Sequence, residues 1–499
     1  MLIHITTRER LMKKLKSLTT WPDHRLIVEL LLDKDANVNA VDEYRSPPFY
    51  LTSQNCHKEA VETLYEGGVN VDALTSSNWT ALHENASKGH CDNVELLLDK
   101  GANVNAVDEN NITPLFLACQ NGHKEVVKTL MRRGANIDVF GHSNWTALHI
   151  SASKGHSGIV DSLLGKGANV NAVSVNNITP LYLASQNKHI QVVETLLRRG
   201  ANIDALTYDK WTALHASACK GYYDIVNLLL ENGINVNAVD KEGVSPLYLA
   251  CQNGHTEIVE TLLRRGANID ALTHNKWTGL HTSAFKGHCD IVNLLLDKNA
   301  DVNAVARGGE SSLYLASLHG HKEVVETLVK KGANIEALTR KKWTALHTSA
   351  SNGHCSIVDF LLDKGAQVNA AGVNNVTSLY LACQNGHKEV VETLTNRGAD
   401  IGIQLANNKW TALHVAASNG HRVVVDLLLE KGAVFNAVDI NDHTPLSLAM
   451  ENGHQDVVQS LFRWSNCMTG TMEFSLTYLL LSLLFLFLGL LIGPRSCTS

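Results

Sequence analysis

The sequence has few cysteines for its length and none of the spacings that cysteine sites use. Ten cysteines occur in 499 residues, and no two of them form a C-x-x-C pair. Disulfide scaffolds are shorter and denser in cysteine, and structural zinc sites use closely paired ligands. Cys119, Cys251 and Cys383 instead recur at intervals of 132 residues. This pattern indicates duplication, and we expect reduced thiols.

The chain also lacks a strongly basic segment. It has 43 Lys and Arg against 49 Asp and Glu, a net charge of −6, with both signs interspersed. A protein that binds DNA or RNA usually carries a basic patch or stripe. We therefore expect no nucleic-acid partner.

Motifs of nucleotide-binding proteins and hydrolases are missing as well. The patterns G-x-x-x-x-G-K, G-x-S-x-G and H-E-x-x-H do not occur, so no P-loop, serine nucleophile elbow or zinc protease helix is indicated. His123-Lys124-Glu125 matches the H-x-E of zinc deaminases, but the P-C-x-x-C that completes such a site is absent. We expect no enzyme: no catalytic residues, metal, cofactor or small-molecule substrate.

What the sequence does contain is a repeat of 33 residues. A threonine or serine followed two positions later by leucine opens each copy, with one spacing of 34 before Thr411. A weaker copy begins near Pro47, and together these make thirteen copies. Such a period is typical of repeat arrays. The opening residues are Thr80, Thr113, Thr146, Thr179, Thr212, Ser245, Thr278, Ser311, Thr344, Thr377, Thr411 and Thr444.

Each copy predicts two short helices and an extended turn. Thr113 can cap the first helix, and Pro114 suits its first position. Gly122 ends that helix because glycine adopts the left-handed conformation easily. Residues 126–130 carry the apolar stripe of a second helix, which Gly134 stops.

These stretches resemble the ankyrin repeat, notably Thr113-Pro114-Leu115, Asn121-Gly122-His123 and Gly134-Ala135-Asn136. The resemblance covers residues 24–464. It implies an all-α solenoid of paired antiparallel helices with β-turn fingers. It also implies a scaffold that binds proteins through its concave face and has no shared enzymatic activity.

One feature departs from the family pattern. The usual glycine two residues before the capping threonine is mostly Asn or Lys, as at Asn78, Asn111, Lys210 and Lys276. Asparagine tolerates a positive φ, but lysine does so less well, so we expect slight strain in the lysine fingers.

A second period of 66 residues overlies the first, because two types of repeat alternate. One type reads like residues 245–255, S-P-L-Y-L-A-C-Q-N-G-H, and the other like residues 276–281, K-W-T-G-L-H. A two-repeat module copied in tandem explains this alternation. Whether the double register is itself functional stays open.

The 24 histidines invite a metal or catalytic interpretation, but their positions favour a structural one. Six follow Thr-x-Leu, as His83 does, and twelve follow the break after the first helix, as His123 does. We expect these side chains to bond the backbone of a neighbouring finger or loop.

The candidate protein-binding residues recur with the double period. A tryptophan precedes the capping threonine in every second repeat, and amide and lysine side chains alternate at the first-helix ends. The resemblance places these positions at the edge of the concave face, and tryptophan is enriched in binding hot spots. The alternative is that each indole only packs on the adjacent finger. The candidates are Trp79, Trp145, Trp211, Trp277, Trp343, Trp410, Gln120, Asn121, Gln252, Asn253, Gln384, Asn385, Lys88, Lys154, Lys220 and Lys286.

The two ends differ from the array. Residues 1–23 contain no secretory signal but can form an amphipathic helix over 7–18. We expect an N-terminal cap or decayed repeat there, with a helix on a membrane surface as the alternative.

Near the C-terminus, residues 474–493 contain no charged residue and are rich in leucine. Twenty helical residues span about 30 Å, the thickness of a bilayer's hydrocarbon core. We expect a linker at 465–473, a transmembrane helix at 474–493 and a short tail at 494–499. This arrangement resembles a tail-anchored protein, with a cytoplasmic array on the endoplasmic reticulum or another secretory membrane.

The sequence as a whole predicts a membrane-tethered ankyrin-repeat scaffold or adaptor. Its expected partners are proteins of unknown identity and, through residues 474–493, the lipid bilayer. One alternative is a pore- or toxin-like component similar to latrotoxins, although channels of that kind need several spans. The other is a soluble adaptor whose hydrophobic tail binds a partner.

Overall fold

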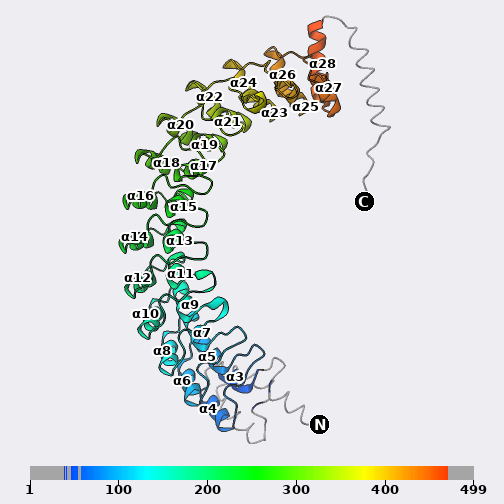
Figure 1. The fold of residues 1–499 in the computed structure, drawn as a ribbon. Coiled ribbons are helices and arrows are strands. Elements are labelled where there is room, and N and C mark those ends of the chain that lie inside the picture. Colours follow the sequence, from blue (N-terminus) through cyan, green and yellow to red (C-terminus); the bar gives the residue numbers. More distant parts are fainter. Residues whose placement is uncertain (1–38, 40, 42–45, 54–57, 470–499) are drawn as a thin grey trace, which may run out of the picture. The chain divides into compact units, whose positions relative to one another are not determined.

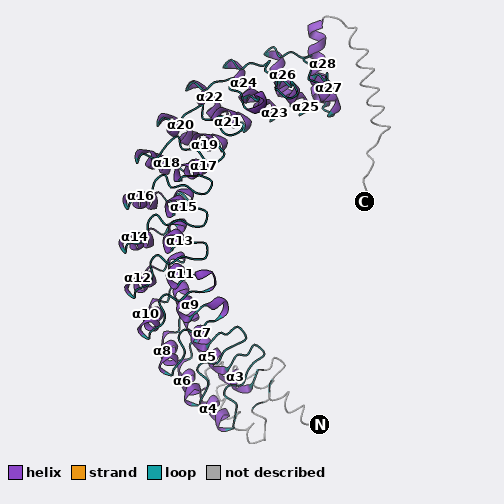
Figure 2. Ribbon diagram, viewed as in Figure 1, coloured by secondary structure: helices purple, strands orange, loops and turns teal. Residues whose placement is uncertain are grey.

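The protein is described by a computed structural model, which covers residues 39, 41, 46–53 and 58–469. Within these ranges the chain forms 26 α-helices and no β-strand (Figure 2). The helices form thirteen pairs, so the expected number of repeats is confirmed. The chain divides between Asn268 and Ile269 into two compact units, here called the N-terminal and C-terminal stacks.

In both stacks a repeat contributes a first helix, a second helix and a finger (Figure 1). The first helices of the N-terminal stack are α3 (Pro48–Ser53), α5 (Ala81–Lys88), α7 (Pro114–Asn121), α9 (Ala147–Lys154), α11 (Pro180–Gln186), α13 (Ala213–Lys220) and α15 (Pro246–Gln252). Its second helices are α4 (Lys58–Glu66), α6 (Cys91–Asp99), α8 (Lys124–Arg132), α10 (Ser157–Gly165), α12 (Ile190–Arg198), α14 (Tyr223–Glu231) and α16 (Thr256–Arg264).

The C-terminal stack repeats this arrangement. Its first helices are α17 (Gly279–Lys286), α19 (Ser312–Leu318), α21 (Ala345–Ser351), α23 (Ser378–Gln384), α25 (Ala412–Ser418) and α27 (Pro445–Glu451). Its second helices are α18 (Cys289–Asp297), α20 (Lys322–Lys330), α22 (Cys355–Asp363), α24 (Lys388–Asn396), α26 (Arg422–Glu430) and α28 (Gln455–Thr469). Short 3₁₀ turns occupy three fingers: η2 (His142–Asn144), η3 (Val175–Asn177) and η4 (Val373–Asn375).

Local capping sets the helix ends, as the sequence predicts. The Thr113 side chain accepts a hydrogen bond from the Phe116 N–H (3.2 Å), and Pro114 occupies the first turn. Gly122 adopts φ 81°, in the left-handed region, and terminates α7. Because these signals recur in each copy, the whole array inherits the same helix bounds to within a residue or two.

The core is a thin apolar layer between the two rows of helices. Val126, Val127 and Leu130 of α8 are at most 1% exposed, and Leu115 of α7 lies against them. Burial of one such side chain contributes about 1.5–3 kcal/mol. Within each stack the first helices pack on one another, and so do the second helices, so every repeat shares its core with its neighbours.

The fingers adopt the backbone conformation that the Asn and Lys substitutions predict. Asn78, Asn111, Lys210 and Lys276 all have positive φ, between 58° and 64°. The lysines therefore occupy a region that L-residues other than Asn and Asp seldom adopt.

Side-chain amides and carboxylates bind successive turns together. Asn105 is representative: its Oδ1 accepts the N–H of Asn136 in the next repeat (2.7 Å), and its Nδ2 donates to the Gly134 carbonyl (3.4 Å). The same contact recurs with Asn171 and Asn202 (2.7 Å), and with Asp204 and Asn235 (2.9 Å).

At the C-terminal end, α28 continues to Thr469 and so enters the residues expected to form a linker. No glycine or proline occurs between Trp464 and Thr469 to stop it. No helix in the described ranges combines the length and apolar character needed to cross a bilayer. Segment 474–493 and the expected cap at 1–23 both lie outside the described residues.

Candidate protein-binding face

The candidate residues lie on the surface formed by the fingers and the C-terminal ends of the first helices, which we call the finger face. In the tryptophan-containing repeats this face is built around a Trp–Thr–x–x–His unit. The imidazole of His83 stacks beside the Trp79 ring at 6.1 Å between centroids, and Trp211 and His215 repeat the arrangement at 5.9 Å.

The histidine completes the N-cap of the first helix. The Thr80 N–H donates to His83 Nδ1 (3.2 Å), while the Thr80 side chain accepts from the His83 N–H. Because Nδ1 accepts, Nε2 must carry the proton of the neutral ring, and it donates to the Ile112 carbonyl in the next finger (3.1 Å). One imidazole therefore caps its own helix and holds the following repeat.

The same network recurs in the other tryptophan-containing repeats, at His149, His215, His347 and His414, with Nε2–O distances of 3.0–3.3 Å. Burial lowers the pKa of His83, although the Ile112 carbonyl and Asp108 oppose the shift. Burial likewise lowers the pKa of His215. These side chains are thus held neutral at neutral pH.

A second row of histidines joins the ends of the first helices. His123 Nε2 donates to the Ser87 carbonyl of the preceding repeat (2.9 Å), and its ring lies over Gly89. A Cβ on Gly89, whose φ is +82°, would lie 2.4 Å from His123 Nδ1, so only glycine fits there. Eight further histidines make the equivalent bond at 2.9–3.3 Å, and the expected structural role of both rows is confirmed.

The six tryptophans are all half-buried, but they divide by the partner of the indole N–H. Nε1 of Trp79, Trp211 and Trp410 donates to an aspartate of the next finger, at 3.0–3.2 Å. These aspartates are Asp108, Asp240 and Asp439. Within the described residues, the indole N–H groups of Trp145, Trp277 and Trp343 make no hydrogen bond.

A change in the next finger accounts for the difference. The positions equivalent to Asp108 are Ser174, Ala306 and Gly372 in the repeats that follow Trp145, Trp277 and Trp343. None of these side chains can offer a carboxylate. The first group of indoles therefore binds fingers together, while the second group keeps a donor on the finger face.

The remaining candidates lie at the first-helix ends, as expected, but the amides are not equivalent. Gln120, Gln384 and the lysines Lys88, Lys154, Lys220 and Lys286 are exposed. Asn121 Nδ2 donates to the Ser87 carbonyl (2.7 Å), and Asn385 Nδ2 donates to the Ser351 carbonyl (2.7 Å). Asn253 bonds its own helix at Leu249 O (2.8 Å), and Gln252 is half-buried. The asparagines thus serve the stack itself.

The described cysteines are all free thiols. Burial raises the pKa of Cys119 to about 12, so this thiol is unreactive at neutral pH. In the part of the chain that the structure describes, no three His, Cys, Asp or Glu side chains converge as ligands of one metal ion.

Sequence reasoning missed two features of this face. It did not find the aspartate partners, which a comparison of equivalent finger positions reveals. It also missed the cations on the fingers of the C-terminal stack, including Arg307, Arg340 and Lys341, because they are dispersed along the chain and form no basic run.

The comparison with protein families agrees with this geometry. A family model for ankyrin repeats in three copies matches residues 22–108, 101–174, 166–240, 235–306, 313–404 and 379–469. A second model, for ankyrin repeats in many copies, matches residues 290–329. A search of curated proteins found no match. The matched segments cover most of the chain, repeat by repeat, and the chain belongs to the ankyrin-repeat family.

Proposed function

We propose that the chain is a scaffold that binds protein partners through the finger face. Ankyrin repeats indicate a module for protein–protein interaction, and members of the family are typically not enzymes. The observation that supports this particular face is the group of indoles whose N–H has no acceptor, Trp145, Trp277 and Trp343. Each is half-buried on a rigid finger, which is the setting of many interface anchors.

The division of the tryptophans provides a matched test. Replacing Trp145 and Trp343 together by Phe removes two free donors and keeps an aromatic ring at each position. Replacing Trp79 and Trp211 together by Phe removes two bonds between fingers. Partners captured from native membranes by the full chain are then compared for the two double variants.

We expect the first variant to lose partner binding with an unchanged melting temperature. The second should melt lower and retain binding at low temperature. Equal binding by the wild type and the Trp145→Phe/Trp343→Phe variant would rule out these indoles as anchors.

We further propose that residues 474–493 tether the scaffold to a membrane, with the array on the cytoplasmic side. The support is the uncharged, leucine-rich sequence itself, whose length matches a bilayer. An adaptor whose hydrophobic tail binds a partner's groove fits the repeat array equally well, and a pore-like component would need further spans.

Alkaline extraction separates the tether from the adaptor. The full chain should stay in the membrane pellet at about pH 11, and a variant lacking residues 474–499 should be soluble, because a bilayer-spanning helix is held by apolar burial. A tail bound to a peripheral partner would release the full chain under the same conditions.

A further inference from the structure

Two residues of the C-terminal stack break the repeat pattern at the same place. Phe285, at the end of α17, occupies a position that is serine or cysteine in the other tryptophan-containing repeats. His319, just after α19, replaces an asparagine. The equivalents of Phe285 are Ser87, Ser153, Cys219, Ser351 and Ser418, and those of His319 are Asn121, Asn187, Asn253, Asn385 and Asn452.

The two replacements contact each other. Elsewhere the asparagine amide donates to the serine backbone, as from Asn385 to Ser351 (2.7 Å). Here the Phe285 and His319 rings meet edge to face, with centroids 4.2 Å apart. The Trp277 ring meets Phe285 at 5.5 Å, again edge to face. Trp277, Phe285 and His319 therefore form a continuous ring cluster.

The ring cluster is accessible and has unused polar capacity. Trp277 and Phe285 are half-buried, and His319 is exposed. The indole N–H of Trp277 faces a finger with Ala306 at the aspartate position and makes no hydrogen bond among the described residues. Desolvation, then His321, His354 and Lys286, lower the pKa of His319, which leaves the ring neutral at neutral pH.

The adjoining cap is also irregular. His281 is fully buried, yet its Nε2 has no hydrogen-bond partner. The Glu310 carbonyl faces this ring and raises its pKa against the larger, lowering effect of burial, but the contact falls outside hydrogen-bond geometry. This finger thus sits differently on its neighbour from the five in which the bond is made.

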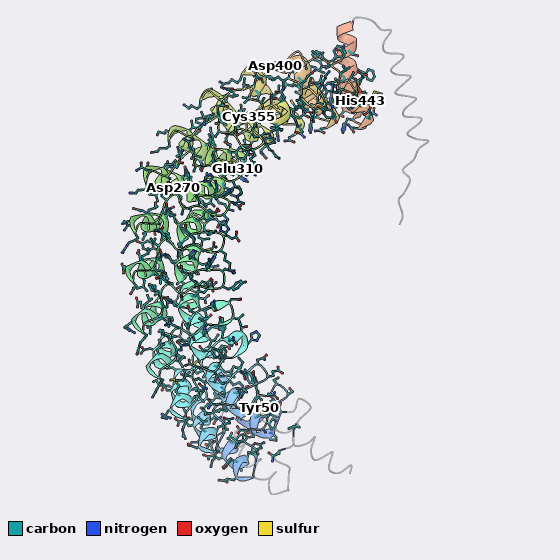
Figure 3. All side chains as sticks on the ribbon, viewed as in Figure 1. Tyr50, Asp270, Glu310, Cys355, Asp400 and His443 are labelled. Atoms are coloured by element: carbon teal, nitrogen blue, oxygen red, sulfur yellow. The ribbon has the colours of Figure 1, made fainter. Side chains whose placement is uncertain are left out.

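The fingers beside the ring cluster are basic. We call the tips 274–276, 307–310 and 340–342 the basic fingers. They carry one acidic residue, Glu310, on the finger side of α19 (Figure 3). Their five cations are exposed, and no carboxylate of the described residues forms an ion pair with them. The cations are Lys276, Arg307, Arg340, Lys341 and Lys342.

Backbone bonds hold these cations in register. The Arg307 N–H donates to the Asn275 carbonyl, and the Arg340 N–H donates to the Gly308 carbonyl, each at 2.9 Å. By contrast, Lys241 in the N-terminal stack is already paired with Asp209 (3.3 Å) and lies over the Tyr208 ring. The basic fingers therefore form an ordered positive surface whose charge is free to act on a ligand.

We infer that the ring cluster and the basic fingers together bind an acidic polypeptide segment that carries an aromatic or large aliphatic anchor. The inference rests on the proposed scaffold function and locates one of its sites. Charge complementarity selects acidic side chains, and the ring cluster takes the anchor between ring edges and the free indole N–H. The rings pack on one another and on His281, so they offer no open faces on which nucleic-acid bases could stack.

The test uses the full chain and a labelled random copolymer of glutamate and tyrosine as the probe. Polyglutamate, polylysine and an oligothymidylate serve as comparison probes, and binding is read from fluorescence anisotropy at low and high salt. The key variant is Phe285→Ser/His319→Asn, which restores the residues of the other repeats and should fold with an unchanged or higher melting temperature.

A charge-reversed pair provides a matched control. Lys342→Glu alters a basic finger, while Lys409→Glu alters the equivalent position before Trp410, outside it. Both lysines are exposed and have similar backbone conformations, with φ 56° and 59°.

We expect the copolymer to bind more tightly than polyglutamate, and polylysine not to bind. Phe285→Ser/His319→Asn and Lys342→Glu should each weaken copolymer binding by at least about tenfold, the effect of one lost hot-spot contact. Lys409→Glu should leave it unchanged. Copolymer binding that is unaffected by the first two variants overturns the inference, as does tighter binding of oligothymidylate through the same residues.

The inference and the proposed function fail separately. If partners are still captured through Trp145 and Trp343 while these variants have no effect, only the assignment of this site is wrong. If the tryptophan variants also leave capture unchanged, the finger face is not the binding surface.

Discussion

At the scale of single residues, the buried histidines connect helix capping to pH. Nδ1 of His215 accepts the Thr212 N–H, and its Nε2 donates to the Val244 carbonyl, so both bonds require the neutral ring. Burial, the largest cause, places the pKa of His215 in the folded chain below its ordinary value. The unfolded chain, with a histidine pKa of about 6.5, therefore binds protons more readily than the folded chain as the pH falls.

This difference predicts acid sensitivity with a definite sign. The stabilisation is complete above about pH 6.5 and is lost as the pH falls below that value, because protonation then favours the unfolded chain. Urea unfolding of the full chain at pH 7.5 and pH 5.5 should give a lower midpoint at pH 5.5. His215→Gln should be less stable at pH 7.5 but lose less on acidification. An identical pH dependence in wild type and variant would contradict the assigned role.

At the scale of the repeat element, the side-chain bonds between turns predict a measurable contribution from Asn105. Asn105→Ala removes the acceptor of the Asn136 N–H (2.7 Å) and should lower the free energy of unfolding by about 1 kcal/mol. Asn105→Asp keeps that acceptor, as Asp204 does for Asn235, and should lose less than half as much. Urea titration measures both, and equal losses would show that the bond to Asn136 is not what matters.

The repeat elements could be predicted from sequence where their causes are local. Thr113, Pro114 and Gly122 define α7 within nine residues, so its ends could be predicted. The aspartate partner of Trp79 could not, because Asp108 lies 29 residues away and meets the indole only when fingers stack. The contact between Phe285 and His319 likewise joins neighbouring repeats. Its signal in the sequence was a departure from the repeat pattern, which reads as noise until the stacked positions are compared.

At the scale of the whole molecule, each repeat has its cohesive contacts with adjacent repeats, so damage should remain local. Leu280 in α17 is 1% exposed, and Leu280→Ala should cost about 2–5 kcal/mol in the repeats that share its core. Hydrogen exchange should then rise around α17 and α19, while amides in α5 to α9 keep their protection. A uniform loss of protection from α5 to α28 would instead show that the array unfolds as one cooperative unit.

The central claim is that partners bind the finger face, and hydrogen exchange of the full chain with and without a captured partner tests it most directly. The account predicts slower exchange in the fingers and at the ends of first helices such as α9, α17 and α21. The second helices α10, α18 and α22 should exchange unchanged, because they form the other row of each stack. Protection confined to the second helices, with the fingers unaffected, would contradict it.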